Sequence, residues 1–310
     1  MPHTLSREAA PQLLHYRPWR GELRSPGASV WPVARVALGM MIRRKLFWLL
    51  YGLGLLFFML FFFSQYMLAY AEAQMTDPNA RNSQGELFKL MRNALKLDGS
   101  GDTYRTFFNY QGYIMMVILA LAGSVIVGND VRFGSLPYYL SKPLSRWHYL
   151  SGKVLAVAVF INLLTTVPAL ILYVQYGLLM NWDYFSEHWD LIIGILAYGA
   201  VLTVSLSMIL LATAMWVRKT VPLIMVWCTL FVLARGITSA LVVILGFDKR
   251  VRLLDLWNDT LLVGSRCLGV SPPFGEFQPP WFEAALVLGG VSLLCLTYLI
   301  LRIRAVEVVR

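Results

Sequence analysis

Long apolar runs separated by short charged segments make up most of this chain. Six of the runs approach or exceed the roughly 20 residues that a helix needs to cross a bilayer core of about 30 Å. They cover residues 46–70, 111–128, 150–178, 191–217, 221–246 and 282–301. None has the alternating polar and apolar positions of a barrel strand, and backbone groups in hydrocarbon must be paired within their own segment. The pattern therefore predicts an all-α membrane protein with six transmembrane helices.

A shorter apolar segment, residues 30–42, precedes the first run and cannot cross a bilayer. Trp31 suits the membrane interface, Pro32 suits a first helical turn, and a basic cluster at 43–45 follows. We therefore expect an amphipathic interfacial (elbow) helix within residues 29–45, lying along the inner membrane surface. Residues 1–28 contain several prolines and arginines and are expected to form a loosely ordered cytoplasmic tail.

Composition and charge support this picture. Hydrophobic residues make up 58% and charged residues 14% of the 310 positions, too little polar surface for a soluble protein of this size. With a cytoplasmic N-terminus, the inner segments hold 17 lysines and arginines and the outer segments 9. The positive-inside rule then predicts a multi-pass protein of the cell (inner) membrane with both termini cytoplasmic. The net charge of +10 mostly reflects the excess of lysine and arginine in the inner segments, with contact to anionic lipids as a secondary interpretation. We expect the lipid bilayer as a partner and no nucleic-acid partner, since no domain remains to bind nucleic acid.

The six-helix domain, residues 46–310, is predicted to have two substantial outer loops, 72–110 and 247–281, and one structured inner loop, 129–149. In the first outer loop, residues 85–96 have the period of a short amphipathic surface helix. In the second, the apolar stretch 253–263 is expected either to dip back into the membrane or to cap the bundle.

The inner loop 129–149 has the pattern of a short amphipathic helix followed by a break. Its apolar positions recur at helical spacing and are Leu136, Tyr139, Leu140, Leu144 and Trp147. The other faces carry Lys142, Arg146 and His148. Pro143 should end this helix, and Ser145 can cap the helix that runs into the next span. The segment is therefore either a docking surface for a partner or an ordinary basic loop.

The sequence offers little that suggests catalysis. The four histidines lie in tails or loops, and Cys228, Cys267 and Cys295 have neither metal nor disulfide spacing. The string 151–153 resembles the end of a phosphate-binding loop, but it lacks the earlier glycine and the preceding strand. We therefore expect no catalytic, metal-binding or cofactor-binding residues in this chain.

Arg235 is the one ionisable residue well inside a predicted span. A charge at that depth is expensive, and it usually faces a partner, a polar cavity or the bundle interior. Two interpretations stay open for Arg235: a functional role, or snorkelling and structural pairing.

The run from Phe133 to Leu155 resembles the inner loop of ABC-2 type permeases. In that family a Gly-[Thr/Ser]-Leu start leads to Leu-Ser-[Arg/Lys]-Pro-[Val/Leu]-Ser-Arg and then to Gly-Lys; here Gly134-Ser-Leu136, Leu140-Ser-Lys-Pro-Leu-Ser-Arg146 and Gly152-Lys153 stand at those places. The resemblance implies a permease subunit of an ATP-binding cassette transporter, with export as the expected direction. Residues 135–148 would form a coupling helix that docks on a separate ATPase subunit, which binds the ATP. The expected docking residues are Leu136, Tyr139, Leu140, Lys142, Leu144 and Arg146.

The same resemblance implies that two six-span chains, as a homodimer or a heterodimer, form the transport pathway. The scarcity of polar clusters in the spans favours a lipidic or amphipathic cargo over a small ion. A membrane scaffold or assembly factor that binds a cytoplasmic partner without transport is the alternative function. A secondary transporter is disfavoured because Arg235 alone lies deep in a span.

Overall fold

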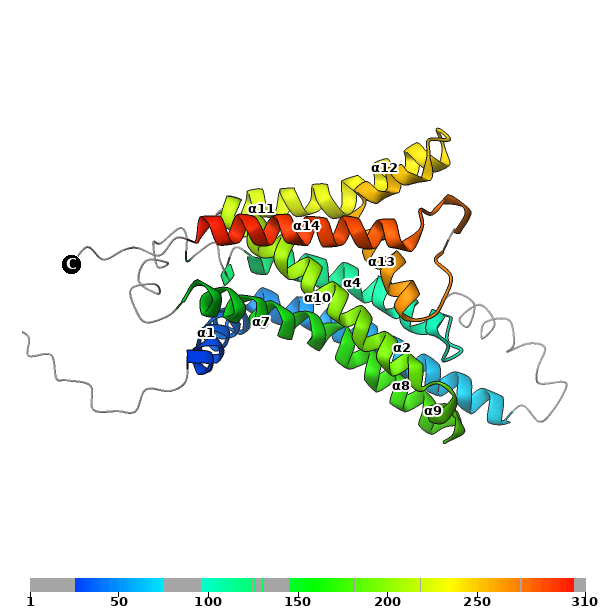
Figure 1. Ribbon diagram of the computed structural model, residues 1–310. Coiled ribbons are helices and arrows are strands. Elements are labelled where there is room, and N and C mark those ends of the chain that lie inside the picture. The colour runs from blue at the N-terminus through cyan, green and yellow to red at the C-terminus, as the bar shows by residue number, and fades with distance from the viewer. Residues whose placement is uncertain are drawn as a thin grey trace, which may run out of the picture.

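The computed structural model describes residues 26–74, 96–123, 125–126, 130, 145–180, 182–217, 219–273 and 275–303. Within these residues every regular element is helical and there is no strand. Six helical segments are long and apolar enough to cross a membrane: Lys45–Tyr70, Gly101–Gly123, Arg146–Met180, Trp189–Val217, Thr220–Val243 and Trp281–Arg302. The all-α architecture with six membrane-spanning helices, preceded by a shorter apolar helix, is thus confirmed (Figure 1).

The first half of the described chain contains η1 (Pro26–Ser29), α1 (Val30–Ile42), α2 (Lys45–Gln74), α4 (Gly101–Gly123), α7 (Arg146–Leu164), α8 (Thr166–Met180) and α9 (Asp183–Glu187). The second half contains α10 (Trp189–Val217), α11 (Thr220–Cys228), the π-helical turn η3 (Thr229–Leu233), α12 (Ala234–Val243), η4 (Lys249–Leu254), α13 (Leu256–Cys267), η5 (Gly275–Phe277) and α14 (Trp281–Arg302). The predicted surface helix at 85–96 lies almost wholly outside the described residues.

Helices α4 and α10 form the centre of the bundle. They are the most buried spans, whereas α2, the α11–α12 segment and α14 are the least buried. Figure 1 shows α1 beside α7 at one end of the bundle and α9 and α13 at the other. We refer to these as the α1 end and the α13 end.

Helix α4 begins at Gly101, well before the expected start of the second span at 111. Its first turns carry Tyr104, Phe107 and Phe108, which are fully buried. The Phe108 and Tyr198 rings lie 4.5 Å apart between centroids. These turns pack against protein rather than lipid, so they tolerate threonine, asparagine and tyrosine, which lower the hydropathy and hide the helix from a search for apolar runs.

The third span is two helices, α7 and α8, that meet at Thr165. Pro168 has no N–H to donate to the carbonyl of Leu164, so the helical hydrogen-bond ladder cannot continue there. The Thr165 hydroxyl donates to the carbonyl of Ile161 at 2.6 Å, and that carbonyl also accepts the backbone N–H of Thr165 at 3.0 Å. This break was not expected from the apolar pattern, because Thr165, Thr166 and Pro168 interrupt it only briefly.

The second outer loop folds into η4 and α13. Asp255 caps α13, because its carboxylate accepts hydrogen bonds from the backbone N–H groups of Trp257 and Asn258 at 3.1 and 3.2 Å. The Trp257 ring lies against Gly112 of α4, where a Cβ atom would come within 2.1 Å of the ring. Helix α13 also packs against α10 and α14. The apolar stretch predicted at 253–263 therefore covers one end of the bundle.

Asp259, one turn after Asp255 in α13, is fully buried, and neither carboxylate oxygen has a hydrogen-bond partner among the described residues. Burial first, and the nearby Asp255 second, raise the pKa of Asp259 from its ordinary value of 3.8 to about 8. The carboxyl binds its proton more tightly in the folded chain than in the unfolded chain. Protonation therefore stabilises the fold at low pH, and this stabilisation is lost as the pH rises from about 4 to about 8.

Replacing Asp259 with Asn should remove this pH dependence, because the amide stays neutral. At about pH 9 we expect the variant to be more stable than the native chain by roughly 2 kcal/mol, the cost of leaving a buried polar group charged and unpaired. Unfolding in detergent across the pH range measures the effect, and Asp183→Asn, an exposed position at the same end, is the control. An unchanged pH slope in the Asp259 variant would show that another group is responsible.

Candidate functional site

A buried ion pair joins the two sides of the inner loop. The Nζ atom of Lys153 in α7 lies 2.6 Å from Oδ2 of Asp130, and their side chains are only 2% and 7% exposed. The Tyr149 hydroxyl donates to the same Asp130 oxygen at 2.8 Å, and Lys153 also donates to the carbonyl of Ile126 at 2.5 Å. Ile126 and Asp130 lie just before and at the start of the inner loop 129–149, whereas Tyr149 and Lys153 lie at its end and just after it. We call these four residues the loop clamp.

Local sequence explains how the clamp residues meet. The Ser145 side chain accepts a hydrogen bond from the backbone N–H of His148 at 3.4 Å, so Ser145 caps α7 as predicted. Tyr149 and Lys153 then lie four residues apart and share one face of α7. Both are buried and face Asp130.

The clamp groups make polar contacts with one another. Lys153 combines an ionic hydrogen bond to Asp130 with one to a backbone carbonyl, and its ammonium lies 5.5 Å from the centroid of the Tyr149 ring. In a buried site, removing one partner of such a pair leaves a charge uncompensated and costs about 3–5 kcal/mol. The clamp therefore holds its two chain segments together strongly, whatever its net contribution to folding.

Helix α1 packs on the same turns of α7. At Gly152, a Cβ atom would lie 2.7 Å from Cβ of Val33 and 3.0 Å from the carbonyl oxygen of Val30. The packed face of α1 also contains Ala34 and Ala37, both fully buried. Small residues on both helices thus allow close approach, and the sequence Gly152-Lys153 places α1 on one side of α7 and the loop clamp on another.

The structure describes only one of the predicted docking residues. Arg146 is the first residue of α7 and is exposed, next to Trp147, which is 56% exposed. The others lie outside the described residues: Leu136, Tyr139, Leu140, Lys142 and Leu144. Sequence reasoning missed the clamp. Lys153 stands out in the sequence only through the Gly152-Lys153 motif and the false phosphate-loop match, although an acid and a lysine at the two ends of one loop are a signal for a pair.

Arg235 makes a structural pairing away from the clamp. It lies in α12, donates a hydrogen bond to the Tyr113 hydroxyl of α4, and holds its guanidinium carbon 5.3 Å from the centroid of that ring. The Tyr113 ring lies 6.1 Å from that of Trp257 in α13. Burial raises the pKa of Asp255 at the start of α13, and the backbone N–H donors and the positive charge of Arg235 oppose that rise. Arg235 thus connects the fifth span to the second span and to the α13 end.

Among the described residues, no group of three or more His, Cys, Asp or Glu side chains could hold a metal ion. The three cysteines are free thiols. The Asp130, Tyr149 and Lys153 side chains of the clamp are buried and hydrogen-bonded to one another, a geometry that suits mechanical connection of the two chain segments.

The family model described as ABC-2 family transporter protein matches residues 31–249. This chain belongs to the ABC-2 transporter family. The match runs from α1 into η4 and includes the inner loop, the loop clamp and five spans, whereas α13 and α14 lie beyond it. No curated protein matches the sequence.

The family match and the six long apolar helices together make the chain a multi-pass membrane component of a transporter. The loop clamp lies at the base of the loop whose motif carries the family resemblance.

Replacing Lys153 with Met should destabilise this ABC-2 protein by about 3 kcal/mol, because Asp130 would be left buried and charged without its partner. The double variant Lys153→Met/Asp130→Asn should recover much of the loss, since it removes both charges. Unfolding by detergent titration measures both effects. The matched control is Lys219→Met, an exposed lysine between α10 and α11. Equal stability losses in the single and double variants would contradict a coupled pair.

Replacing Gly152 with Ala should displace α1 from α7, because the new methyl group would overlap Val33 and the Val30 carbonyl. We expect a loss of about 1–3 kcal/mol and faster proteolysis of the α1 segment. Gly39→Ala, within α1 itself, is the control, since nothing lies within 4 Å of its Cβ position. Similar behaviour of the two variants would rule out a close α1–α7 contact.

Proposed function

We propose that this chain is the permease subunit of an ABC exporter and that the inner loop 129–149 docks on a separate ATPase subunit. The loop clamp is the observation that carries the proposal. It links the start of the loop to α7 at the end of the loop through a buried ion pair of 2.6 Å. A displacement of the loop would therefore be transmitted both to α7 and to the segment that follows α4.

In this mechanism ATP binds to the partner subunits and closes their dimer. The docked loops convert closure into a tilt of α7, and α1, packed on α7 at Gly152, moves with it. Such coupling requires that the docked loop make different contacts in the two states of the ATPase. The positive-inside distribution of lysine and arginine supports a cytoplasmic α1 end, where an ATPase would reach it.

Two copies of the chain, or this chain and a related permease, would form the pathway together with two ATPases. The spans with the largest exposed apolar surface support this. Helix α2, the α11–α12 segment and α14 are the least buried within a single chain, so they are free to face lipid or a second permease. The scaffold alternative shares the docking loop but requires no transport.

Replacing Leu140 or Tyr139 with Glu should weaken association with the ATPase, because a charge would enter an apolar contact. Interface anchors of this kind commonly contribute about 2 kcal/mol or more, which corresponds to roughly thirtyfold in affinity. Co-purification and ATP hydrolysis by the complex in lipid nanodiscs measure the effect. Leu140→Met, which keeps an apolar side chain, should bind normally.

The purified chain alone should not hydrolyse ATP, and robust hydrolysis by it would overturn the assignment. Unchanged co-purification of both Glu variants would place the docking contact elsewhere. Reconstituted vesicles that contain both subunits, consume ATP and move none of a panel of lipidic and soluble substrates would favour the scaffold.

A further inference from the structure

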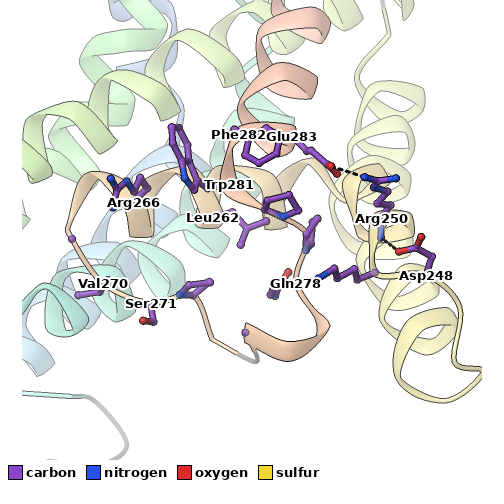
Figure 2. A pocket seen from close by; sticks show the side chains of 16 residues that line it. Asp248, Arg250, Leu262, Arg266, Val270, Ser271, Gln278, Trp281, Phe282 and Glu283 are labelled. Atoms are coloured by element: carbon purple, nitrogen blue, oxygen red, sulfur yellow. Dashed lines mark hydrogen bonds and ion pairs between the residues drawn. The ribbon is translucent and has the colours of Figure 1, made fainter.

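A pocket of about 780 Å³ opens at the α13 end, outside the loop clamp and largely beyond the family match. Figure 2 shows how η4, α13, the following loop and the first turn of α14 surround it. Basic side chains come from two sides, Lys249 and Arg250 from η4 and Arg266 from the last turn of α13. Trp281 and Phe282 provide apolar surface at the start of α14.

The two acidic residues of the pocket are already engaged. Glu283 accepts an ionic hydrogen bond from the Arg250 guanidinium at 3.0 Å, and the Asp248 carboxylate accepts from the backbone N–H of Arg250 at 3.1 Å (Figure 2). Lys249 and Arg266 have no acidic partner among the described residues. Asp248 keeps its negative charge, because a backbone N–H does not neutralise it. The pocket lining thus holds three cationic and two anionic side chains, a net charge of +1, and Lys249 and Arg266 are its two cations without an ion pair among the described residues.

Trp281 orients one of these cations. The guanidinium carbon of Arg266 lies 5.6 Å from the centroid of the Trp281 ring. A cation–π contact of this kind leaves N–H groups of the guanidinium free to donate hydrogen bonds to a ligand. A planar fork of donors suits the oxygens of a phosphate group, to which arginine commonly binds in bidentate fashion.

The position of the pocket indicates where its ligand comes from. The last span begins at Trp281, and the Trp281 and Phe282 side chains are 47% and 51% exposed. Tryptophan at the end of a span lies at the membrane interface, the level of the lipid headgroups. A ligand at this level has an anionic group for Lys249 and Arg266 and an apolar part for Trp281 and Phe282.

We propose that this pocket binds the phosphate-bearing headgroup of an anionic amphiphile from the membrane. Lys249 and Arg266 donate hydrogen bonds to the phosphate oxygens, and Trp281 and Phe282 contact the adjoining apolar part. Binding needs neither ATP nor a partner subunit, so it can be tested on the chain alone. Failure of this proposal would leave the docking function of the inner loop untouched.

The test is thermal unfolding of the full chain in a nonionic detergent at fixed ionic strength. Short-chain phosphatidylglycerol, short-chain phosphatidylcholine and inorganic phosphate are titrated separately. A ligand that binds the folded chain raises its unfolding midpoint by mass action. We expect saturable stabilisation by phosphatidylglycerol, and little by the other two at the same concentration.

The double variant Lys249→Gln/Arg266→Gln should bind phosphatidylglycerol at least about tenfold more weakly, because two hydrogen bonds from charged donors are lost. Both side chains are exposed, so the unliganded midpoint should stay near that of the native chain. Lys249→Arg, which keeps the charge at that position and leaves Arg266 in place, should retain binding. Arg302→Gln, an exposed arginine at the other end of α14, is the matched control and should behave like the native chain.

Three results would overturn the proposal. Equal stabilisation by phosphatidylcholine would show that net negative charge is not recognised. Equal stabilisation by inorganic phosphate at the same concentration would show a free anion as ligand rather than a membrane amphiphile. Unchanged affinity in the Gln double variant would show that the lipid binds elsewhere on the chain.

Discussion

The buried pair between Asp130 and Lys153 is the contact on which the α1 end of this protein depends. Two charges inside a membrane-spanning bundle are tolerated only when each compensates the other, so neither residue can move alone at low cost. The pair brings the chain after α4 against α7, and Gly152 beside it brings α1 against the opposite side. Two apolar surfaces of equal size could shift along one another, because their contacts are not directional. The charge pair and the Tyr149 hydrogen bond to Asp130 are directional, so they fix the position of Asp130 along α7. Three elements therefore behave as one body at the base of the inner loop.

The α13 end is organised differently. Its interior contacts are aromatic, and in the one that involves a charge only one partner is charged. Arg235 lies over the Tyr113 ring, the Tyr113 ring lies near that of Trp257, and the Trp257 ring packs against Gly112. The carboxyl group of Asp259 is buried without a partner. Such an arrangement has weaker directional constraints than a buried ion pair, because aromatic and cation–π contacts tolerate a range of angles. The α13 end also contains an ion pair, Arg250 with Glu283, but the Arg250 side chain is 68% exposed, so this pair constrains its partners less than the buried clamp pair does.

The sequence predicted the fold class well because hydropathy is a property of whole segments. Six spans, the short helix before them and the Ser145 cap all follow from residues within one element. What it could not predict depends on partners distant in the chain. The first turns of α4 are too polar for a lipid-facing helix and are helical because Tyr104, Phe107 and Phe108 pack in the core. The clamp joins residues 23 positions apart across the loop, and an acid and a lysine at the two ends of a loop suggest a pair without showing that the fold brings them into contact.

The break between α7 and α8 limits how far a rigid unit at the α1 end can extend. Pro168 has no N–H, so the two halves of the third span are joined by one backbone hydrogen bond fewer than a continuous helix would have. The Thr165 hydroxyl also donates to the Ile161 carbonyl, a side-chain contact that often bends a helix. Under the proposed function, a tilt imposed on α7 by the docked loop can be absorbed at Thr165 without the same tilt in α8. The inner half of the span would then follow the ATPase while α8 stays packed against α2 and α10. The clamp and the helix break thus have complementary roles under the proposed function. The clamp transmits a displacement of the loop to α7, and the break at Thr165 limits how much of that displacement reaches α8.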